Sequence, residues 1–146
     1  MKLRGNCQAK VDEKGRLKIP AVFLEELKEY GNHFYVTSTT GESAMVYPMK
    51  VWTAIEDKLA TLPSTNRAKK KFLVRTSYFG LAVEMDSQGR ILLPPVLREA
   101  AQTRGEVDVL GALDHLEVTN HTRMADQLKN DPYTDKDDEA LEELGI

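Results

Sequence analysis

The segment "VDEKGRLKIP" (residues 11–20) returns later in the chain as "MDSQGRILLP" (residues 85–94). Both spell Asp-x-x-Gly-Arg, then three residues and a Pro, 74 positions apart in a chain of 146 residues. Residues 9–31 and 83–105 share seven identities in 23 positions: Asp12/Asp86, Gly15/Gly89, Arg16/Arg90, Pro20/Pro94, Val22/Val96, Glu25/Glu99 and Gly31/Gly105. Two copies are too few for a solenoid. The repeat therefore predicts two similar halves that pair about a pseudo-two-fold axis.

Each copy predicts a β-hairpin followed by a short helix. Asp bonds backbone amides two residues further on, and Gly accepts a positive φ, so Asp-x-x-Gly is typical of a turn. The residues before it alternate loosely, and "RLKI" or "RILL" returns as a second strand. Pro20 and Pro94 suit a helix start, and Gly31 and Gly105 suit its end. The expected apolar faces are Val22, Phe23 and Leu27 in the first helix, and Val96, Leu97 and Ala101 in the second.

The remaining pattern completes a chain of alternating strands and helices. Strands are expected at residues 33–39, 43–48, 106–113 and 115–120. One helix over 50–62 has Trp52, Ile55, Leu59 and Leu62 on one face. Another, over 64–79, starts at a Ser64 or Thr65 cap and buries Ala68, Phe72 and Phe79. A helix over 122–129 follows, and a short one is possible over 140–144. We divide the chain into a first repeat (1–80), a second repeat (81–130) and an acidic mobile tail (131–146).

Charge is unevenly spread along the chain. The net charge is −3, yet residues 125–146 hold eight acids and two lysines, so the rest of the chain is positive. The first 20 residues hold six basic and two acidic side chains, and residues 67–75 hold five basic ones and no acid. A basic front with an acidic tail favours binding to a polyanion.

Several function classes find no support in the sequence. There is no apolar run of the ~20 residues that a membrane span needs, and the start of the chain lacks the apolar region of a secretory signal. The single Cys7 fits a reducing cytoplasm. No phosphate-cradling glycine loop occurs, and His115 and His121 do not have metal-ligand spacing. We expect no enzyme, no cofactor, no metal, no small-molecule substrate and no membrane partner.

The Arg of each motif has two uses that do not exclude each other. It can pair with the Asp four residues earlier and stiffen the turn, or it can present a guanidinium to phosphate or to a guanine edge. Around the first copy, Lys10, Lys14, Arg16 and Lys18 share one face by the period of two. The second copy keeps only Arg90, so we expect the first half to meet the polyanion. The run Lys69–Lys71 is ordinarily a solvated helix face, although Arg67, Lys70 and Lys71 could touch a phosphate backbone.

Another function to consider is a hydrolase that uses the two Asp residues of the motifs as a catalytic pair of carboxylates. Asp12 and Asp86 would have to be buried close together to split their pKa values, whereas turns beside Arg and Lys lower a carboxylate pKa. We therefore expect Asp12, Gly15, Asp86 and Gly89 to be structural.

The two motifs at this spacing resemble the MraZ family, as do "RG" (4–5), "YPMKVW" (47–52) and "YFGLAVEMDSQGRILLPPVLREAA" (78–101). The resemblance covers about residues 1–130. It implies an α+β, mainly β fold: an AbrB-like swapped-hairpin barrel built from an internal two-fold repeat, with peripheral helices.

The resemblance also implies a function. Members of the family form ring-like homo-oligomers, bind repeated short G-rich boxes of promoter DNA, and regulate, generally repress, their own division and cell-wall operon. The family's Asp-x-x-x-Arg motif maps to Asp12 and Arg16, and to Asp86 and Arg90. We expect Arg16 to contact a base edge, with Lys10, Lys14, Lys18 and Arg4 on phosphates, and we leave open whether Arg90 touches DNA.

The expected location is the cytoplasm, in association with the nucleoid. The alternative is an antitoxin-like or scaffold module that binds a protein and has no specific operator.

Overall fold

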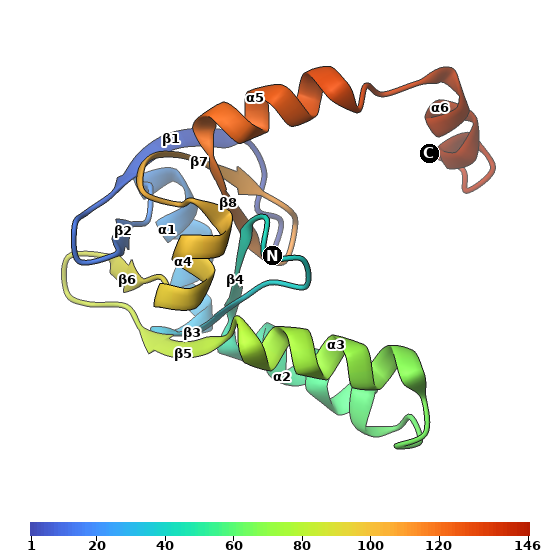
Figure 1. The fold of residues 1–146 in the computed structure, drawn as a ribbon, viewed down its shortest axis with the longest axis horizontal. Coiled ribbons are helices and arrows are strands. Elements are labelled where there is room, and N and C mark those ends of the chain that lie inside the picture. Colours follow the sequence, from blue (N-terminus) through green and yellow to red (C-terminus); the bar gives the residue numbers. More distant parts are fainter.

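The computed structural model describes residues 1–146 as one antiparallel sheet, curled into a nearly closed barrel, with helices around it (Figure 1). The strand order is β5-β3-β4-β8-β7-β1-β2-β6. The strands are β1 (Asn6–Val11), β2 (Arg16–Lys18), β3 (His33–Thr37), β4 (Ala44–Pro48), β5 (Leu81–Glu84), β6 (Arg90–Leu92), β7 (Gly105–Gly111) and β8 (Leu116–Asn120). The helices are α1 (Ala21–Leu27), extended by the 3-10 turn η1 (Lys28–Tyr30), α2 (Met49–Ala60), α3 (Arg67–Tyr78), α4 (Pro95–Ala101), α5 (His121–Asn130) and α6 (Asp135–Glu142).

The two motifs form their turns as predicted, but the strands on either side of each turn pair elsewhere. Val11 and Leu17 are the only paired residues between β1 and β2. Beyond that point β1 pairs with β7 along its length, and β2 pairs with β6 of the other copy. In the second copy, β5 pairs with β3 instead of β6. The prediction that the two strands of each copy form a hydrogen-bonded ladder with each other is therefore wrong. The predicted swapped-hairpin barrel is confirmed.

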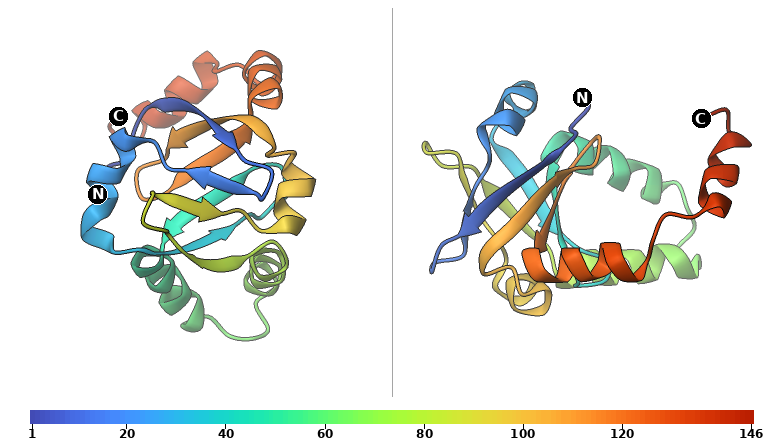
Figure 2. Two further views of the ribbon diagram at one scale, coloured as in Figure 1. Left: turned by 90° about the vertical axis from the view of Figure 1, so that its left-hand side faces the viewer. Right: turned by 90° about the horizontal axis from the view of Figure 1, so that it is seen from above.

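Reciprocal contacts tie the two copies together. The amide of Ile19 donates to the carbonyl of Gly89, and the amide of Leu93 donates to the carbonyl of Gly15, at 2.9 Å each. Each bond joins the end of one motif to the turn of the other. Figure 2 (left) shows β2 and β6 side by side at the face where both turns lie. The pseudo-two-fold axis predicted from the repeat passes between these two strands.

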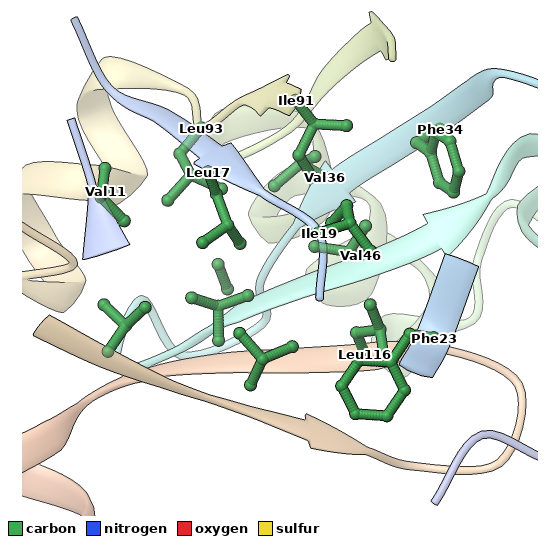
Figure 3. Packing of buried hydrophobic residues seen from close by; sticks show 14 of the residues in the cluster. Val11, Leu17, Ile19, Phe23, Phe34, Val36, Val46, Ile91, Leu93 and Leu116 are labelled. Atoms are coloured by element: carbon green, nitrogen blue, oxygen red, sulfur yellow. The ribbon is translucent and has the colours of Figure 1, made fainter. Parts of the chain in front are cut away.

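The core collects the inward residues of both copies. Leu17 and Ile19 of the first copy meet Ile91 and Leu93 of the second, together with residues such as Phe34 of β3 (Figure 3). All of these side chains are at most 1% exposed, as close packing at the axis requires. The apolar residues of each copy supply only part of this single core, so neither copy can bury its apolar face without the other.

The short helices differ in detail from the prediction. Phe23 and Leu27 of α1 are buried, and so are Leu97 and Ala101 of α4. Val22 and Val96, however, are 61% and 46% exposed, because each helix has only seven residues and one narrow buried face.

The ends of these helices also differ between the copies. Gly31 follows η1 with a φ of 84°, as expected of a stop. Gly105 is not the stop of the second helix, since Gln102 takes the left-handed conformation there with a φ of 54°. Gly105 instead begins β7.

Two helical arms leave the barrel on the side opposite the motif turns (Figure 1 and Figure 2, right). One is α2 with α3, where Trp52 is buried and stacks on Tyr35 and Phe72. The cap of α3 is Asn66, which accepts from the amide of Lys69, and not Ser64 or Thr65; Ala68, expected to be buried, is exposed.

The other arm is α5 followed by α6. The expected helix over 122–129 is present as α5, one residue longer at each end. The expected short helix over 140–144 begins earlier, at Asp135, because Thr134 and Asp137 form a capping box that starts it there.

Candidate nucleic-acid interface

Each Asp of the repeated motif holds its own turn closed. Asp12 accepts hydrogen bonds from the amides of Lys14 (3.0 Å) and Arg16 (2.9 Å) through Oδ1, and from Nε of Arg16 (2.9 Å) through Oδ2. Asp86 repeats this with the amide of Gln88, the amide of Arg90 and Nε of Arg90, at 2.9 Å each. The structural role expected of both carboxylates is thus accounted for by three bonds in each copy.

These bonds keep both carboxylates ionised. The backbone hydrogen bond from Arg16, with its side-chain bond and charge, lowers the pKa of Asp12 below its usual value. The amide and guanidinium of Arg90 lower the pKa of Asp86 in the same way. Both side chains lie in exposed turns, 39% and 37% accessible. A shared-proton pair needs a raised pKa and burial, so the geometry does not support an acid–base dyad.

The two arginines keep donors for other partners. In each motif the carboxylate engages only Nε, and neither Nη atom of Arg16 or Arg90 forms a hydrogen bond within the chain. A guanidinium has five N–H donors, of which four belong to the Nη atoms. Pairing with Asp and reaching for an external acceptor are therefore compatible in the same side chain.

The β2–β6 ribbon gathers the cations of both copies on one face. Its register sets Lys18 opposite Arg90, and Arg16 opposite Leu92. Since Leu17 and Ile91 point into the core, these four residues point outward by the period of two. We call this outward surface, made of Arg16, Lys18, Arg90 and Leu92, the ribbon face.

Arg90 is thus a neighbour of the lysine-rich copy. The local sequence does not indicate that Arg90 lies beside Lys18, because this position depends on which strand β2 pairs with. The sequence-based view that the second copy contributes little charge holds for its own turn, where Glu84 and Gln88 replace lysines, but not for the ribbon face.

The other expected contact residues lie at different distances from the ribbon face. Lys14 is exposed in the first turn, next to it. Lys10 is exposed on β1, where its strand partner is Glu106, so part of its charge is offset. Arg4 is exposed at the far end of β1, about 25 Å along an extended strand from Asp12.

Arg98 is a cation of this region that the sequence did not single out. Its guanidinium packs directly over Gly15, where a Cβ would overlap Nη1 and Cζ. The pseudo-equivalent contact in the second turn is made by Leu24, whose Cδ1 lies 3.6 Å from the place of a Cβ on Gly89. Nη1 of Arg98 is buried and has no hydrogen-bond partner. Only the first turn therefore has a cation behind it.

None of the helices combines the length and apolar character needed to cross a membrane. No group of three or more His, Cys, Asp or Glu side chains is arranged to hold a metal ion.

Known proteins resemble the chain along almost its whole length. A family model described as "MraZ protein, putative antitoxin-like" matches residues 3–75 and again 81–144. Proteins named transcriptional regulator MraZ are 49% identical in Acidobacterium capsulatum (98% of this chain, 99% of the relative) and 45% identical in Koribacter versatilis (98% and 99%). One from Alkaliphilus metalliredigens is 38% identical (97% and 98%). The doubled match, the swapped barrel and these identities establish that the chain belongs to the MraZ family.

Proposed function

We propose that the protein is a transcriptional regulator that binds promoter DNA through the ribbon face. The observation that carries this proposal is the ribbon itself: two paired strands from different copies, with Arg16, Lys18 and Arg90 outward and a rigid turn at each end. The major groove of B-DNA admits a two-stranded β-ribbon. The names of the relatives support the same function.

Within the ribbon face, Arg16 is the residue that we propose contacts a base edge. Asp12 fixes its Nε, so the remaining donors are presented with little loss of conformational freedom on binding. Arg bonded bidentately to guanine O6 and N7 is the commonest specific contact in the major groove, which suits a G-rich box. Arg90 joins it from the partner strand. Lys18, Lys14 and Lys10 neutralise phosphates, and Arg4 does so where the duplex follows β1.

The finer proposal concerns assembly and target. The protein acts as a ring-like homo-oligomer on repeated short boxes, and represses its own division and cell-wall operon in the nucleoid. A few cations on one ribbon give a weak, salt-sensitive contact. Several ribbons on one assembly raise the overall affinity through effective concentration, and bound promoter DNA is closed to polymerase.

Removing Arg16 tests the proposal. We expect Arg16→Ala to weaken binding to the native promoter fragment by about 1–3 kcal/mol and to reduce its preference over a scrambled fragment. Lys18→Ala should weaken both fragments alike and lower the salt slope by about one unit. Fluorescence anisotropy titrations at several salt concentrations measure both quantities.

Lys58→Ala is the matched control, since it removes an exposed cation from α2, on the opposite side of the barrel. Undiminished promoter affinity in a folded Arg16→Ala protein would remove Arg16 from the interface.

The family description favours one other function, an antitoxin-like protein that binds a protein partner. The same titrations separate the two functions. An antitoxin-like module without an operator shows equal affinity for promoter and scrambled DNA, already in the wild-type chain.

A further inference from the structure

One exposed face of α3 is strongly basic, and no acidic side chain of the chain pairs with it. Nη1 of Arg75 donates to the carbonyl of Thr39 at 3.2 Å, at the far end of this face. Arg67, Lys70, Lys71 and Arg75 follow each other at helical spacing, with Val74, 60% exposed, between them. They line a groove of about 710 Å³ at the start of the helix. None of these four cations forms an ion pair. We call this surface the α3 face.

A complementary stripe lies on α6. Asp135, Asp138, Glu139 and Glu142 recur with the same spacing of three and four residues, and all are exposed. None of them takes part in an ion pair. Two apolar residues follow directly, Leu144 and Ile146, 75% and 80% exposed. The stripe thus matches the α3 face in charge, in period and in having an exposed apolar residue beside it.

Both surfaces lie on the side of the barrel away from the ribbon face (Figure 1 and Figure 2, right). A duplex bound along the ribbon would have the barrel between it and α3, so the same straight duplex does not account for the α3 cations. Within one chain, α3 and α6 belong to different arms, which leave the barrel after β4 and after β8, and no ion pair joins them. The partner that fits the α3 face is therefore an acidic helix.

We propose that α6 of one copy lies on the α3 face of a second copy. Four acids of α6 then oppose four cations of α3, and Val74 meets the apolar end of the partner's tail. Because the two surfaces differ, the contact is heterologous: each copy gives one and receives one, and the series closes into a ring or extends as a filament. This inference rests on the proposed self-association, and it assigns the acidic tail a role.

Paired charge reversals test the contact. The first variant, Lys70→Glu with Lys71→Glu, makes the α3 face acidic. The second, Glu139→Lys with Glu142→Lys, makes α6 basic. New acids near the start of α3 and new lysines in the second half of α6 suit the helix dipoles, so both helices remain stable. Lys50→Glu with Lys58→Glu on α2 is the control for the first variant, with the same change of charge. Unfolding curves confirm that each variant folds.

Sedimentation velocity at about 50 mM and about 500 mM NaCl gives the readout, since salt screens exposed pairs. We expect each reversal alone to weaken self-association by roughly 10- to 100-fold. An equimolar mixture of the two variants should assemble again, because the acidic α6 of the first fits the basic α3 of the second, and the reversed pair is complementary too. The α2 control should assemble like the wild type.

The outcomes that overturn the inference are distinct from a failure of the proposed function. If the wild type assembles and neither reversal changes it, the contact lies elsewhere. If each reversal dissociates the assembly and the mixture stays dissociated, α6 and the α3 face are not each other's partners. If the wild type itself is monomeric at low salt, self-association fails with the contact, whereas promoter binding by the ribbon is judged separately by the Arg16 titrations.

Discussion

At the scale of single residues, the Asp of each motif determines what its Arg can do. Asp12 closes the turn with Oδ1 and holds Nε of Arg16 with Oδ2, so the guanidinium is oriented before any ligand arrives. The sequence left two uses of this Arg open, and the structure makes them compatible, because one carboxylate occupies only one of three nitrogens. Such a division of donors is a matter of geometry and is not visible in residue spacing.

The lowered pKa values lead to a prediction about acid stability. A carboxylate whose folded pKa is depressed contributes stability that is fully present above its unfolded pKa of 3.8 and is lost as the pH falls through the folded value. The double variant Asp12→Asn, Asp86→Asn should therefore lose stability at pH 6 and show a flatter decline below about pH 4 than the wild type. Urea unfolding midpoints measured from pH 6 to well below pH 4 give the difference.

Asp57→Asn serves as the control, since Asp57 is an exposed carboxylate of α2 in no ion pair. A decline of the double variant that parallels both the wild type and this control would show that the turn carboxylates do not govern acid stability.

At the scale of elements, the sequence predicted the strands and helices well and their partners poorly. The turns, the eight strands and α1 to α5 follow from turn residues, apolar periodicity and prolines. What could not follow is the exchange of partners, in which β2 pairs with β6 and β5 with β3. Both hairpin and swapped pairing satisfy the same alternation in each copy, and only the shared core decides between them. The AbrB-like arrangement came from the family resemblance alone.

Smaller differences have local causes. Asn66 caps α3 because its side chain reaches the amide of Lys69, three residues on, which Ser64 and Thr65 are placed too early to do. The α6 start was missed because Asp137 fills the acidic position of the capping box, where Glu or Gln is the usual signal. Of the candidate interface, the turn residues and Arg16 could be predicted locally. The neighbours Arg90 and Arg98 depend on the tertiary fold.

The same substitution is expected to cost much more stability on the inner face of the ribbon than on the outer face. Leu17 is fully buried and Leu92 is 38% exposed, although they lie on adjacent strands. Leu17→Ala should destabilise the fold by about 2–5 kcal/mol through lost burial and a cavity. Leu92→Ala should change stability by no more than about 1 kcal/mol. Denaturant unfolding measures both, and similar losses would contradict the register of β2 with β6.

At the scale of the whole molecule, the proposed functions are divided between two sides. The ribbon face looks away from both helical arms, so a copy can hold DNA on one side while its arms hold neighbouring copies (Figure 2, right). Each copy in an assembly would then present one ribbon, and binding becomes a property of the number of ribbons engaged.

Multivalent binding predicts a dependence on the number and phase of the boxes. Compared with one promoter box, fragments with two or three boxes at native spacing should bind more tightly by a factor of ~10²–10⁴. The helical repeat of B-DNA is about 10.5 bp, so inserting about 5 bp between boxes turns them to opposite faces of the duplex. This insertion should remove most of the gain in affinity. Anisotropy titrations compare these fragments. An affinity per box that ignores number and phase would argue for independent monomers.

The exchange of strands between the two copies also affects how the protein folds during translation. When the first 80 residues have emerged, β2 has only a single paired residue on β1, and β1 and β3 lack the partners that β7 and β5 will provide. The nascent half exposes strand edges that the second half, or the equivalent strands of another nascent chain, can complete. When closely spaced ribosomes translate one messenger RNA, strand pairing within a nascent chain therefore competes kinetically with strand pairing between neighbouring nascent chains.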